Sequence, residues 1–190
     1  MRVIAGRYRS RPLRSLCGMD VRPTTDRLRE TLFNVLTAGN PATLEGSLWI
    51  DVYAGTGAVG IEALSRGAGK VIFVESSAAA VKIIGQNLNS LRLKSGFEVL
   101  PTSALQGLRR VEADSVCADI IFLDPPYRME QAYRDMLRFL AGSALLKPSS
   151  IVIAEHHKKF DPGGKFGSLA RYRTLQQGDA ALSFYRRSSA

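Results

Sequence analysis

Apolar segments typical of strands alternate with segments typical of helices from residue 48 to residue 154. The strand-like segments are short and rich in Val, Ile, Leu and Phe, as buried parallel strands are. Parallel neighbours need a crossover connection, which a helix usually supplies. The alternation therefore favours an α/β fold with a mainly parallel sheet and helices on both faces. We expect strands over 48–53, 70–75, 97–100, 120–123 and 150–154, and helices over 59–66, 77–91, 103–111 and 130–140.

The segments on either side of this region carry signals of their own. Residues 2–16 alternate loosely between arginines and apolar residues, which predicts a two-stranded β-ribbon. A threonine N-cap, with Asp26 in the first turn, predicts a helix that ends near residue 39. The tail segments 170–175 and 181–186 predict a closing antiparallel pair, and the lysine and proline before residue 150 predict a turn.

The 190 residues suit one domain with a sizeable core. We expect no membrane association, because the apolar runs are short and the N-terminus lacks a signal-peptide core. Cys17 and Cys117 lie far apart, and His156 and His157 are adjacent. These spacings predict a reduced, cytoplasmic protein without a metal site. We expect both histidines at the surface.

Positive charge is concentrated near the N-terminus. The formal net charge is +9, and residues 1–30 contain eight arginines and three acidic residues. Arginine makes forked contacts with phosphate and stacks on bases, so this segment favours a nucleic acid as partner. A solvated basic face would explain the charge as well. The candidate RNA-binding residues are Arg2, Arg7, Tyr8, Arg9, Arg11 and Arg22.

The most informative motif is Asp124-Pro125-Pro126-Tyr127, directly after the apolar strand at 120–123. Proline fixes φ and lacks an N–H, so the two prolines end the strand and stiffen the loop. Asp124 and the neighbouring carbonyls supply hydrogen-bond acceptors, and Tyr127 supplies a flat face. Acceptors that hold the hydrogens of a nucleobase amine free its lone pair for attack. We therefore treat all four as candidate catalytic residues; the structural alternative is a proline turn with a stacked tyrosine.

A glycine-rich turn, Asp51-Val-Tyr-Ala-Gly55-Thr-Gly57-Ala-Val-Gly60, follows the first strand of the alternation, and Glu75 ends the second. This spacing is a dinucleotide fingerprint, although it suits any nucleoside that lies across a doubly wound sheet. Asp51 favours S-adenosylmethionine, because a carboxylate suits an ammonium group better than a pyrophosphate. Glu75 can accept hydrogen bonds from two ribose hydroxyls. The candidate cofactor-binding residues here are Asp51, Tyr53, Ala54, Gly55, Gly57, Glu75, Ser76, Ser103 and Ala104.

Together these motifs resemble the class I S-adenosylmethionine-dependent methyltransferases that modify nucleobase amines. Arg22-Pro-Thr-Thr-Asp-Arg-Leu-Arg-Glu-Thr-Leu-Phe-Asn34, Glu62-Ala-Leu-Ser-Arg-Gly67 and Gly178-Asp-Ala-Ala-Leu-Ser-Phe-Tyr185 narrow the resemblance to the RsmD family. These bacterial enzymes methylate N2 of one guanine in 16S rRNA, guanine 966, during small-subunit assembly.

The resemblance implies a Rossmann-like class I methyltransferase fold with a mainly parallel seven-stranded sheet. It implies two regions, a basic β-hairpin arm that helps to hold RNA over residues 1–20 and the methyltransferase domain over 21–190. It further implies that Thr24 and Thr25 lie over the cofactor cleft and bind the cofactor. We expect a monomer that acts on 16S rRNA within the 30S subunit or an assembly intermediate.

Three other functions fit parts of the pattern. An adenine-N6 methyltransferase acting on DNA or RNA needs the same proline motif, and an NAD-dependent oxidoreductase would use the same glycine turn. The third is a basic RNA-binding assembly factor without catalysis. Ser103 keeps this last alternative open, because many members of the family carry Asp or Asn there to bind the adenine edge. Ser103 also suits the N-cap of the helix at 103–111.

Overall fold

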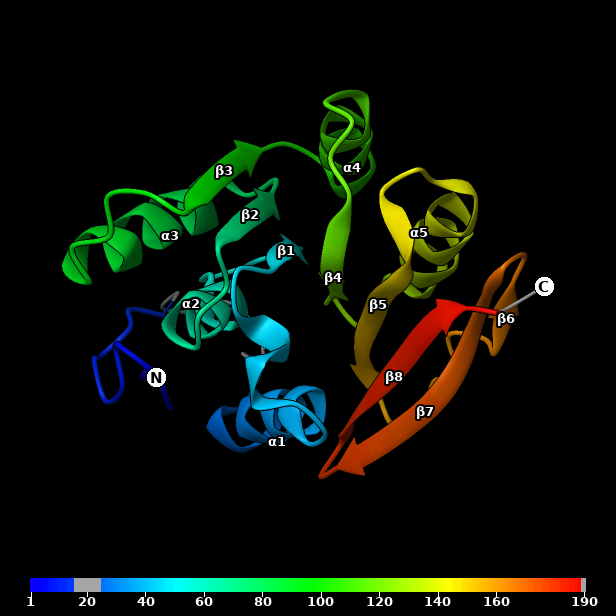
Figure 1. Ribbon diagram of the computed structural model, residues 1–190, viewed down its shortest axis with the longest axis horizontal. Coiled ribbons are helices and arrows are strands. Elements are labelled where there is room, and N and C mark those ends of the chain that lie inside the picture. Colours follow the sequence, from blue (N-terminus) through cyan, green and yellow to red (C-terminus); the bar gives the residue numbers. More distant parts are fainter. Residues whose placement is uncertain (16–24, 189–190) are drawn as a thin grey trace.

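The computed structural model describes residues 1–15 and 25–188. Its strands are β1 Leu48–Val52, β2 Lys70–Glu75, β3 Phe97–Pro101, β4 Ala118–Leu123, β5 Leu146–His157, β6 Lys165–Phe166, β7 Leu169–Gln177 and β8 Ala180–Arg187. They form one sheet in the order β3-β2-β1-β4-β5-β8-β7-β6 (Figure 1). The first five strands are parallel, and β8, β7 and β6 extend the sheet with antiparallel pairs.

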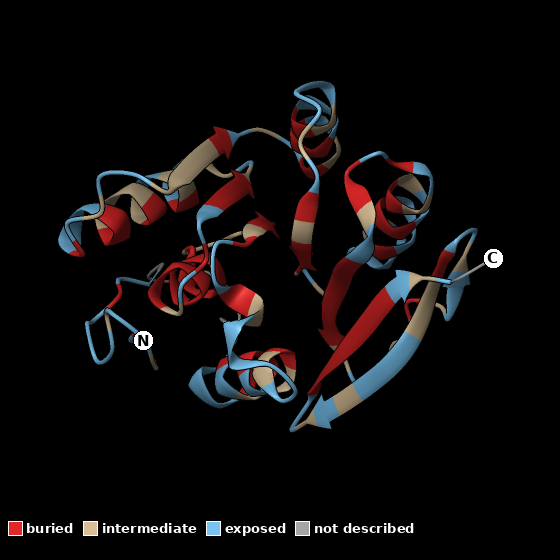
Figure 2. Ribbon diagram, viewed as in Figure 1, coloured by how far each residue is buried: buried red, intermediate tan, exposed pale blue. Residues whose placement is uncertain are grey.

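Helices cover both faces of this sheet, as the alternation predicts. They are α1 Asp26–Thr37, the 3-10 helix η1 Pro41–Leu44, α2 Ala58–Ser65, α3 Ala78–Ser90, α4 Ala104–Ala113 and α5 Glu130–Gly142. Side chains of α1, α2 and α3 pack on one face, and those of α4 and α5 pack on the other. Figure 2 shows that burial is continuous along the central strands, whereas β7 is largely exposed. The mainly parallel α/β class is therefore confirmed.

The first helix begins as the sequence indicates. Thr25 is the N-cap of α1, and its Oγ1 accepts a hydrogen bond from the backbone N of Leu28 over 3.2 Å. Asp26 occupies the first turn, where a negative charge is favourable. The predictions for Thr24 and Arg22 concern positions outside the described residues.

The sheet differs from the expectation at two places. It has eight strands instead of seven, because the two-residue β6 pairs with β7. β5 begins at Leu146, so Lys147 and Pro148 lie inside a strand and not in a turn before it. A register shift in β4 after Ala118 lets β5 pair across the proline, and Ser150 Oγ donates to Ala118 O over 2.5 Å. Proline is tolerated in strands at such irregular positions.

The N-terminal segment, residues 1–15, is a hairpin-like loop with one isolated bridge, Arg2 to Pro12, and not the regular ribbon that the alternation predicts. The reason is that Ile4 and Ala5 donate their backbone N–H groups to the carboxylate of Glu62, instead of to a partner strand. Val3 and Leu13 are buried in the same core cluster as α1, α2 and α3.

Within the described residues, no helix is long and apolar enough to cross a bilayer. The same part of the chain contains no group of three or more His, Cys, Asp or Glu side chains placed to hold a metal ion.

Candidate active site

The glycine turn and the proline loop leave the sheet side by side. β1 and β4 are parallel neighbours, and Val52 pairs with Leu123 at their carboxyl ends. Beyond this pair, the backbone N of Asp124 donates to Val52 O over 3.3 Å. The strand order reverses between β1 and β4, and ligands of open α/β sheets bind at such a point. The fold therefore brings the two motifs together at the carboxyl ends of the central strands.

The glycine turn exposes bare backbone. Tyr53, Gly55 and Gly57 have positive φ angles of 63°, 54° and 76°. A Cβ added at Gly57 would lie 3.3 Å from the Phe73 ring, so this glycine serves packing. A Cβ at Gly55 would meet only the carbonyl oxygen of Tyr53, at 4.0 Å. Gly55 therefore faces open space. This is required of a backbone that a nucleoside approaches closely.

Glu75 is held in a fixed position at the end of β2. Its Oε2 accepts from the backbone N of Gly55 over 2.8 Å, and its Oε1 accepts from Ser77 N over 2.7 Å. Each carboxylate oxygen can accept more than one hydrogen bond, so both retain capacity for a ligand. A preoriented carboxylate beside an open glycine fits the ribose diol of S-adenosylmethionine. Ser76, the next residue, is exposed at the same edge.

Asp51 lies beneath the glycine turn. Its side chain is buried, and Oδ2 accepts from the backbone N of Gly60 over 2.9 Å. This bond ties β1 to the first turn of α2 and closes the turn between them. Burial raises the pKa of the Asp51 carboxyl to about 7. Direct contact between Asp51 and the cofactor ammonium stays a prediction.

Ser103 occupies the N-cap position of α4, but its side chain makes no capping bond. Ser103 Oγ and Thr102 Oγ1 instead donate to Gln106 Oε1, over 2.8 and 3.0 Å. Ala104 is buried behind them. Since β3 is the parallel neighbour of β2, these residues share the sheet edge with Glu75. The role of Ser103 in adenine binding stays a prediction.

Tyr133 of α5 fixes the proline loop from below. Its single Oη–H is shared between Pro125 O, at 3.1 Å, and Glu155 O, at 2.9 Å. Burial raises the pKa of the phenol, so the hydroxyl keeps its proton. Pro125 is buried and Pro126 is exposed. Tyr133 therefore holds the proline loop in position. The sequence analysis missed this residue, because its place on the apolar face of a helix predicts only a core position.

Tyr127 lines a cavity of about 180 Å³ with residues from three other parts of the chain. The proline loop, the start of α1, the end of β5 and the turn between β7 and β8 surround it. The lining residues are Thr25, Arg27, Leu28, Tyr127, Glu155, Gln177, Gly178 and Ala180. The cavity thus brings together residues of three of the motifs that carry the resemblance, those at 22–34, 124–127 and 178–185.

The two histidines have different environments. His156 is buried, contrary to the expected surface position, and its Nε2 lies 2.9 Å from Ser183 Oγ. It is buried because β5 continues to His157 and pairs with β8 there. Burial lowers the pKa of the His156 imidazole. His157 is half-buried, and its ring meets Tyr127 edge-on with centroids 5.8 Å apart. The sequence analysis did not predict this contact. It arises because His157 is the last residue of β5, beside the proline loop.

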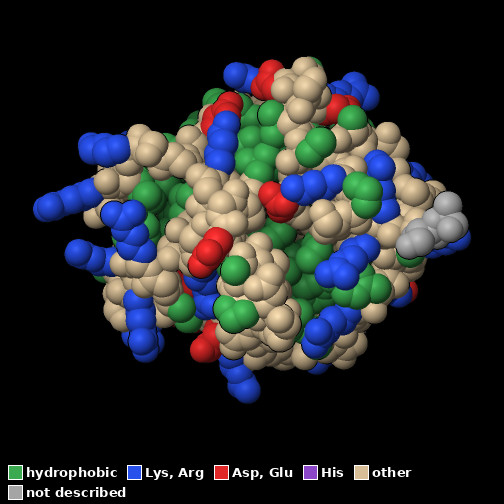
Figure 3. Space-filling model, viewed as in Figure 1, with side chains coloured by type: hydrophobic (Ala, Val, Ile, Leu, Met, Phe, Trp, Pro, Cys, Tyr) green, Lys and Arg blue, Asp and Glu red, His purple; other side chains and the backbone are tan. Residues whose placement is uncertain are grey.

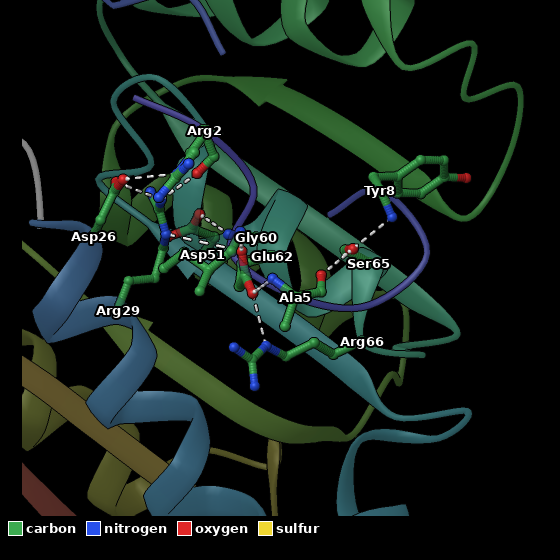
Figure 4. Close-up of polar contacts among 11 residues, drawn as sticks. Arg2, Ala5, Tyr8, Asp26, Arg29, Asp51, Gly60, Glu62, Ser65 and Arg66 are labelled. Carbon is green, nitrogen blue, oxygen red and sulfur yellow. Dashed lines mark hydrogen bonds and ion pairs between the residues drawn. The ribbon is translucent and has the colours of Figure 1, made fainter. Parts of the chain in front are cut away.

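A buried polar network anchors the N-terminal segment (Figure 4). Glu62 of α2 accepts from the backbone N atoms of Ile4 and Ala5, over 2.8 and 3.0 Å, and from Arg66 Nε over 2.7 Å. Arg29 of α1 is fully buried and donates to the carbonyl of Arg2 over 2.5 Å. The segment is therefore fastened to two helices of the core.

The predicted RNA-binding residues of this segment remain accessible. Arg2, Arg7, Arg9 and Arg11 are exposed, and Tyr8 is half-buried. Figure 3 shows Lys and Arg side chains projecting along the edge of the molecule where Figure 1 places the N-terminal segment and α3.

Comparisons with known proteins identify the family of the chain. The family model described as "Conserved hypothetical protein 95" matches residues 1–186. A Haemophilus influenzae (strain ATCC 51907 / DSM 11121 / KW20 / Rd) protein named "Ribosomal RNA small subunit methyltransferase D" is 36% identical over 159 residues, which cover 83% of this chain and 79% of the relative. The protein of the same name from Escherichia coli (strain K12) is 29% identical over 189 residues, or 100% and 91% of the two chains.

Solved structures show the same fold. The structure of yhhF from Escherichia coli matches with a TM-score of 0.82 and 28% identity, covering 98% of this chain and 97% of that one. SMU.776, solved in complex with SAH, matches with a TM-score of 0.66 and 13% identity over 84% and 48% of the two chains. The family match spans nearly the whole chain, and the Gly55–Glu75 pair fits a nucleoside. The chain therefore belongs to the RsmD family of class I methyltransferases, and its cofactor is S-adenosylmethionine.

Proposed function

We propose that this protein methylates the exocyclic N2 amine of a guanine in 16S rRNA, at the family's target, guanine 966. The names of the relatives from Haemophilus influenzae and Escherichia coli support a small-subunit rRNA as substrate. The net charge of +9 and the exposed arginines of the N-terminal segment suit a polyanion. In this proposal the enzyme is a cytoplasmic monomer that acts on the 30S subunit or an assembly intermediate.

The observation that carries the proposal is the position of Asp124 and Tyr127. Asp124 directly follows β4 and bonds through its backbone N to Val52, where the glycine turn after β1 begins, and Tyr127 follows three residues later. Tyr127 also lines the cavity of about 180 Å³, which provides a place for part of an extruded base. Acceptors and a flat ring thus lie next to the part of the chain that fits the cofactor.

The residues of the proline loop have distinct roles in this proposal. When bound, S-adenosylmethionine supplies an electrophilic methyl group on its sulfonium. Asp124 and the Pro125 carbonyl accept hydrogen bonds from the amine and hold its nitrogen in line, and most of the rate gain comes from this positioning. Tyr127 stacks on the base, and such stacking contributes about 1–3 kcal/mol per base to the free energy of binding. The amine becomes acidic as its new C–N bond forms, so Asp124 can accept the proton without being a strong base.

Labelled S-adenosylmethionine and small subunits from a strain that lacks the activity provide the test. Wild-type protein should label one guanine, identified by mapping the modified base. Asp124→Ala should abolish transfer and leave cofactor affinity unchanged in calorimetric titration. Asp114→Ala, which removes an exposed carboxylate at the end of α4, is the matched control. Wild-type transfer by Asp124→Ala refutes the mechanism. Labelling of adenine, or RNA binding without transfer by the wild type, refutes the function in favour of the alternatives.

A further inference from the structure

We propose that a cleft between the N-terminal segment and the end of α3 binds the phosphodiester backbone of the RNA substrate. The identity of the ligand as RNA rests on the proposed function. The cleft has a volume of about 340 Å³ and is lined by Arg7, Tyr8, Arg11, Ser90, Leu91 and Arg92. Its second wall, residues 90–92, carries no sequence signal for RNA binding.

Both walls of the cleft are held by the core. Arg7 N donates to Ser65 O over 2.7 Å, and Tyr8 N donates to Ser65 Oγ over 2.9 Å. Asn87 of α3 is fully buried, accepts from Arg14 N over 2.8 Å and donates to Arg14 O over 3.2 Å. Figure 4 shows the Tyr8 ring pointing away from this anchoring network. The cleft is therefore preformed, and binding would not require the segment to fold first.

The charges around the cleft are uncompensated within the described part of the chain. Arg7, Arg11 and Arg92 are exposed, and none of them forms an ion pair with a described carboxylate. Three guanidinium groups around one hollow attract phosphate. The guanidinium carbon of Arg7 lies over the Tyr8 ring, 5.5 Å from its centre, so the ring holds the Arg7 charge at the cleft. Phosphate-binding groups beside an aromatic ring suit a nucleotide chain.

The backbone at Arg92 gives independent support. Arg92 has a φ of 58°, just after the end of α3. Its backbone N donates to Asn89 O over 2.9 Å, and Leu93 N donates to Leu88 O over 3.1 Å, so these bonds terminate the helix. Glycine is the favoured residue at such a left-handed helix end, because any side chain there is strained. Strained residues cluster at functional sites, and an arginine in this position points to a role for its side chain.

Arg92→Gly separates this role from folding. The substitution should raise or preserve the thermal midpoint, since glycine relieves the strain. It should weaken binding of deproteinised 16S rRNA about fivefold at 0.1 M salt and reduce the slope of log K against log salt by about 0.7, the value for one phosphate contact to a single strand. Arg109→Ala removes one exposed charge from α4 on the opposite face of the sheet and should change neither. Wild-type affinity and slope in Arg92→Gly overturn the proposal.

Inorganic phosphate serves as a second probe, because it shares the chemistry of the RNA backbone. Competition by phosphate against RNA, beyond that of chloride at equal ionic strength and dependent on Arg92, supports the site. Phosphate binding that depends on Arg92 without an effect on RNA binding overturns it. Methyl transfer is measured separately. If the wild type fails to methylate guanine, the proposed function is wrong. The dependence of RNA affinity on Arg92 still shows whether the cleft binds RNA.

Discussion

Removal of the Tyr133 hydroxyl should weaken both the fold and the reaction. Tyr133→Phe removes the one buried O–H donor that lies 3.1 Å from Pro125 O and 2.9 Å from Glu155 O. A lost hydrogen bond of this kind costs about 1 kcal/mol, and buried acceptors left unsatisfied cost about 1–3 kcal/mol. We expect the free energy of unfolding to fall by about 2 kcal/mol, which lowers the thermal midpoint of a chain of this size by about 4–8 °C.

The same change should slow methyl transfer, because the Pro125 carbonyl is no longer held toward the amine. A misplacement that costs about 1.4 kcal/mol in the transition state slows the reaction tenfold. The Michaelis constant for S-adenosylmethionine should stay unchanged, since most of the predicted cofactor-binding residues lie on the turns after β1, β2 and β3. Thermal unfolding followed by circular dichroism and single-turnover transfer, measured well below the lower midpoint, provide the two readouts.

Tyr185→Phe is the matched control. Tyr185 is also fully buried, and its Oη donates to Gly163 O over 2.8 Å, away from the proline loop. This variant should lose stability and keep its turnover rate. Transfer at the wild-type rate by Tyr133→Phe, or an equal loss of rate in both variants, would show that Tyr133 does not position the loop.

Three further predictions concern carboxylates. Glu75→Ala should weaken S-adenosylmethionine binding about tenfold or more in calorimetric titration, because it removes a charged acceptor. The rate of transfer at saturating cofactor should stay nearly unchanged. Normal cofactor affinity in this variant contradicts a role of Glu75 in binding. Burial raises the pKa of Asp51 from 3.8 to about 7. The protonated carboxyl therefore contributes up to about 4 kcal/mol of stability below about pH 4, and this contribution is lost as the pH rises through 7. Asp51→Asn should remove this pH dependence when the free energy of unfolding in urea is compared at pH 5 and pH 8. Glu62→Ala removes the acceptor of the Ile4 and Ala5 N–H groups and of Arg66 Nε, whereas Arg29 keeps its 2.9 Å ion pair with Asp26. It should cost about 1–3 kcal/mol and speed tryptic cleavage of the N-terminal segment, and an unchanged digestion rate argues against anchoring.

Local patterns were sufficient for the central part of the fold. Each of the apolar runs at β1, β2 and β4 lies in the core, and their residues alternate between the two helix-covered faces. Proline chemistry placed the loop at Asp124 directly after its strand. The N-cap at Thr25 also followed from residue type alone.

Features that depend on long-range pairing were beyond sequence reasoning. His156 is buried because β5 pairs with β8, a partner that no local pattern identifies. Lys147 and Pro148 join a strand because Ser150 and a register shift in β4 accommodate them. Tyr133 resembles any other core residue of an amphipathic helix until its hydroxyl is seen beside Pro125. Arg92 acquires meaning only from the segment that lies opposite it.

Backbone hydrogen bonds between β1 and β4, not side chains, set the distance from the glycine turn to the proline loop. Neighbouring strands lie about 4.8 Å apart whatever their sequence. The elements that contact the RNA backbone in our proposals, the N-terminal segment and the end of α3, lie outside this pair. We therefore expect chimeras that exchange these outer elements with those of a relative to acquire a new target while they inherit an unaltered reaction geometry.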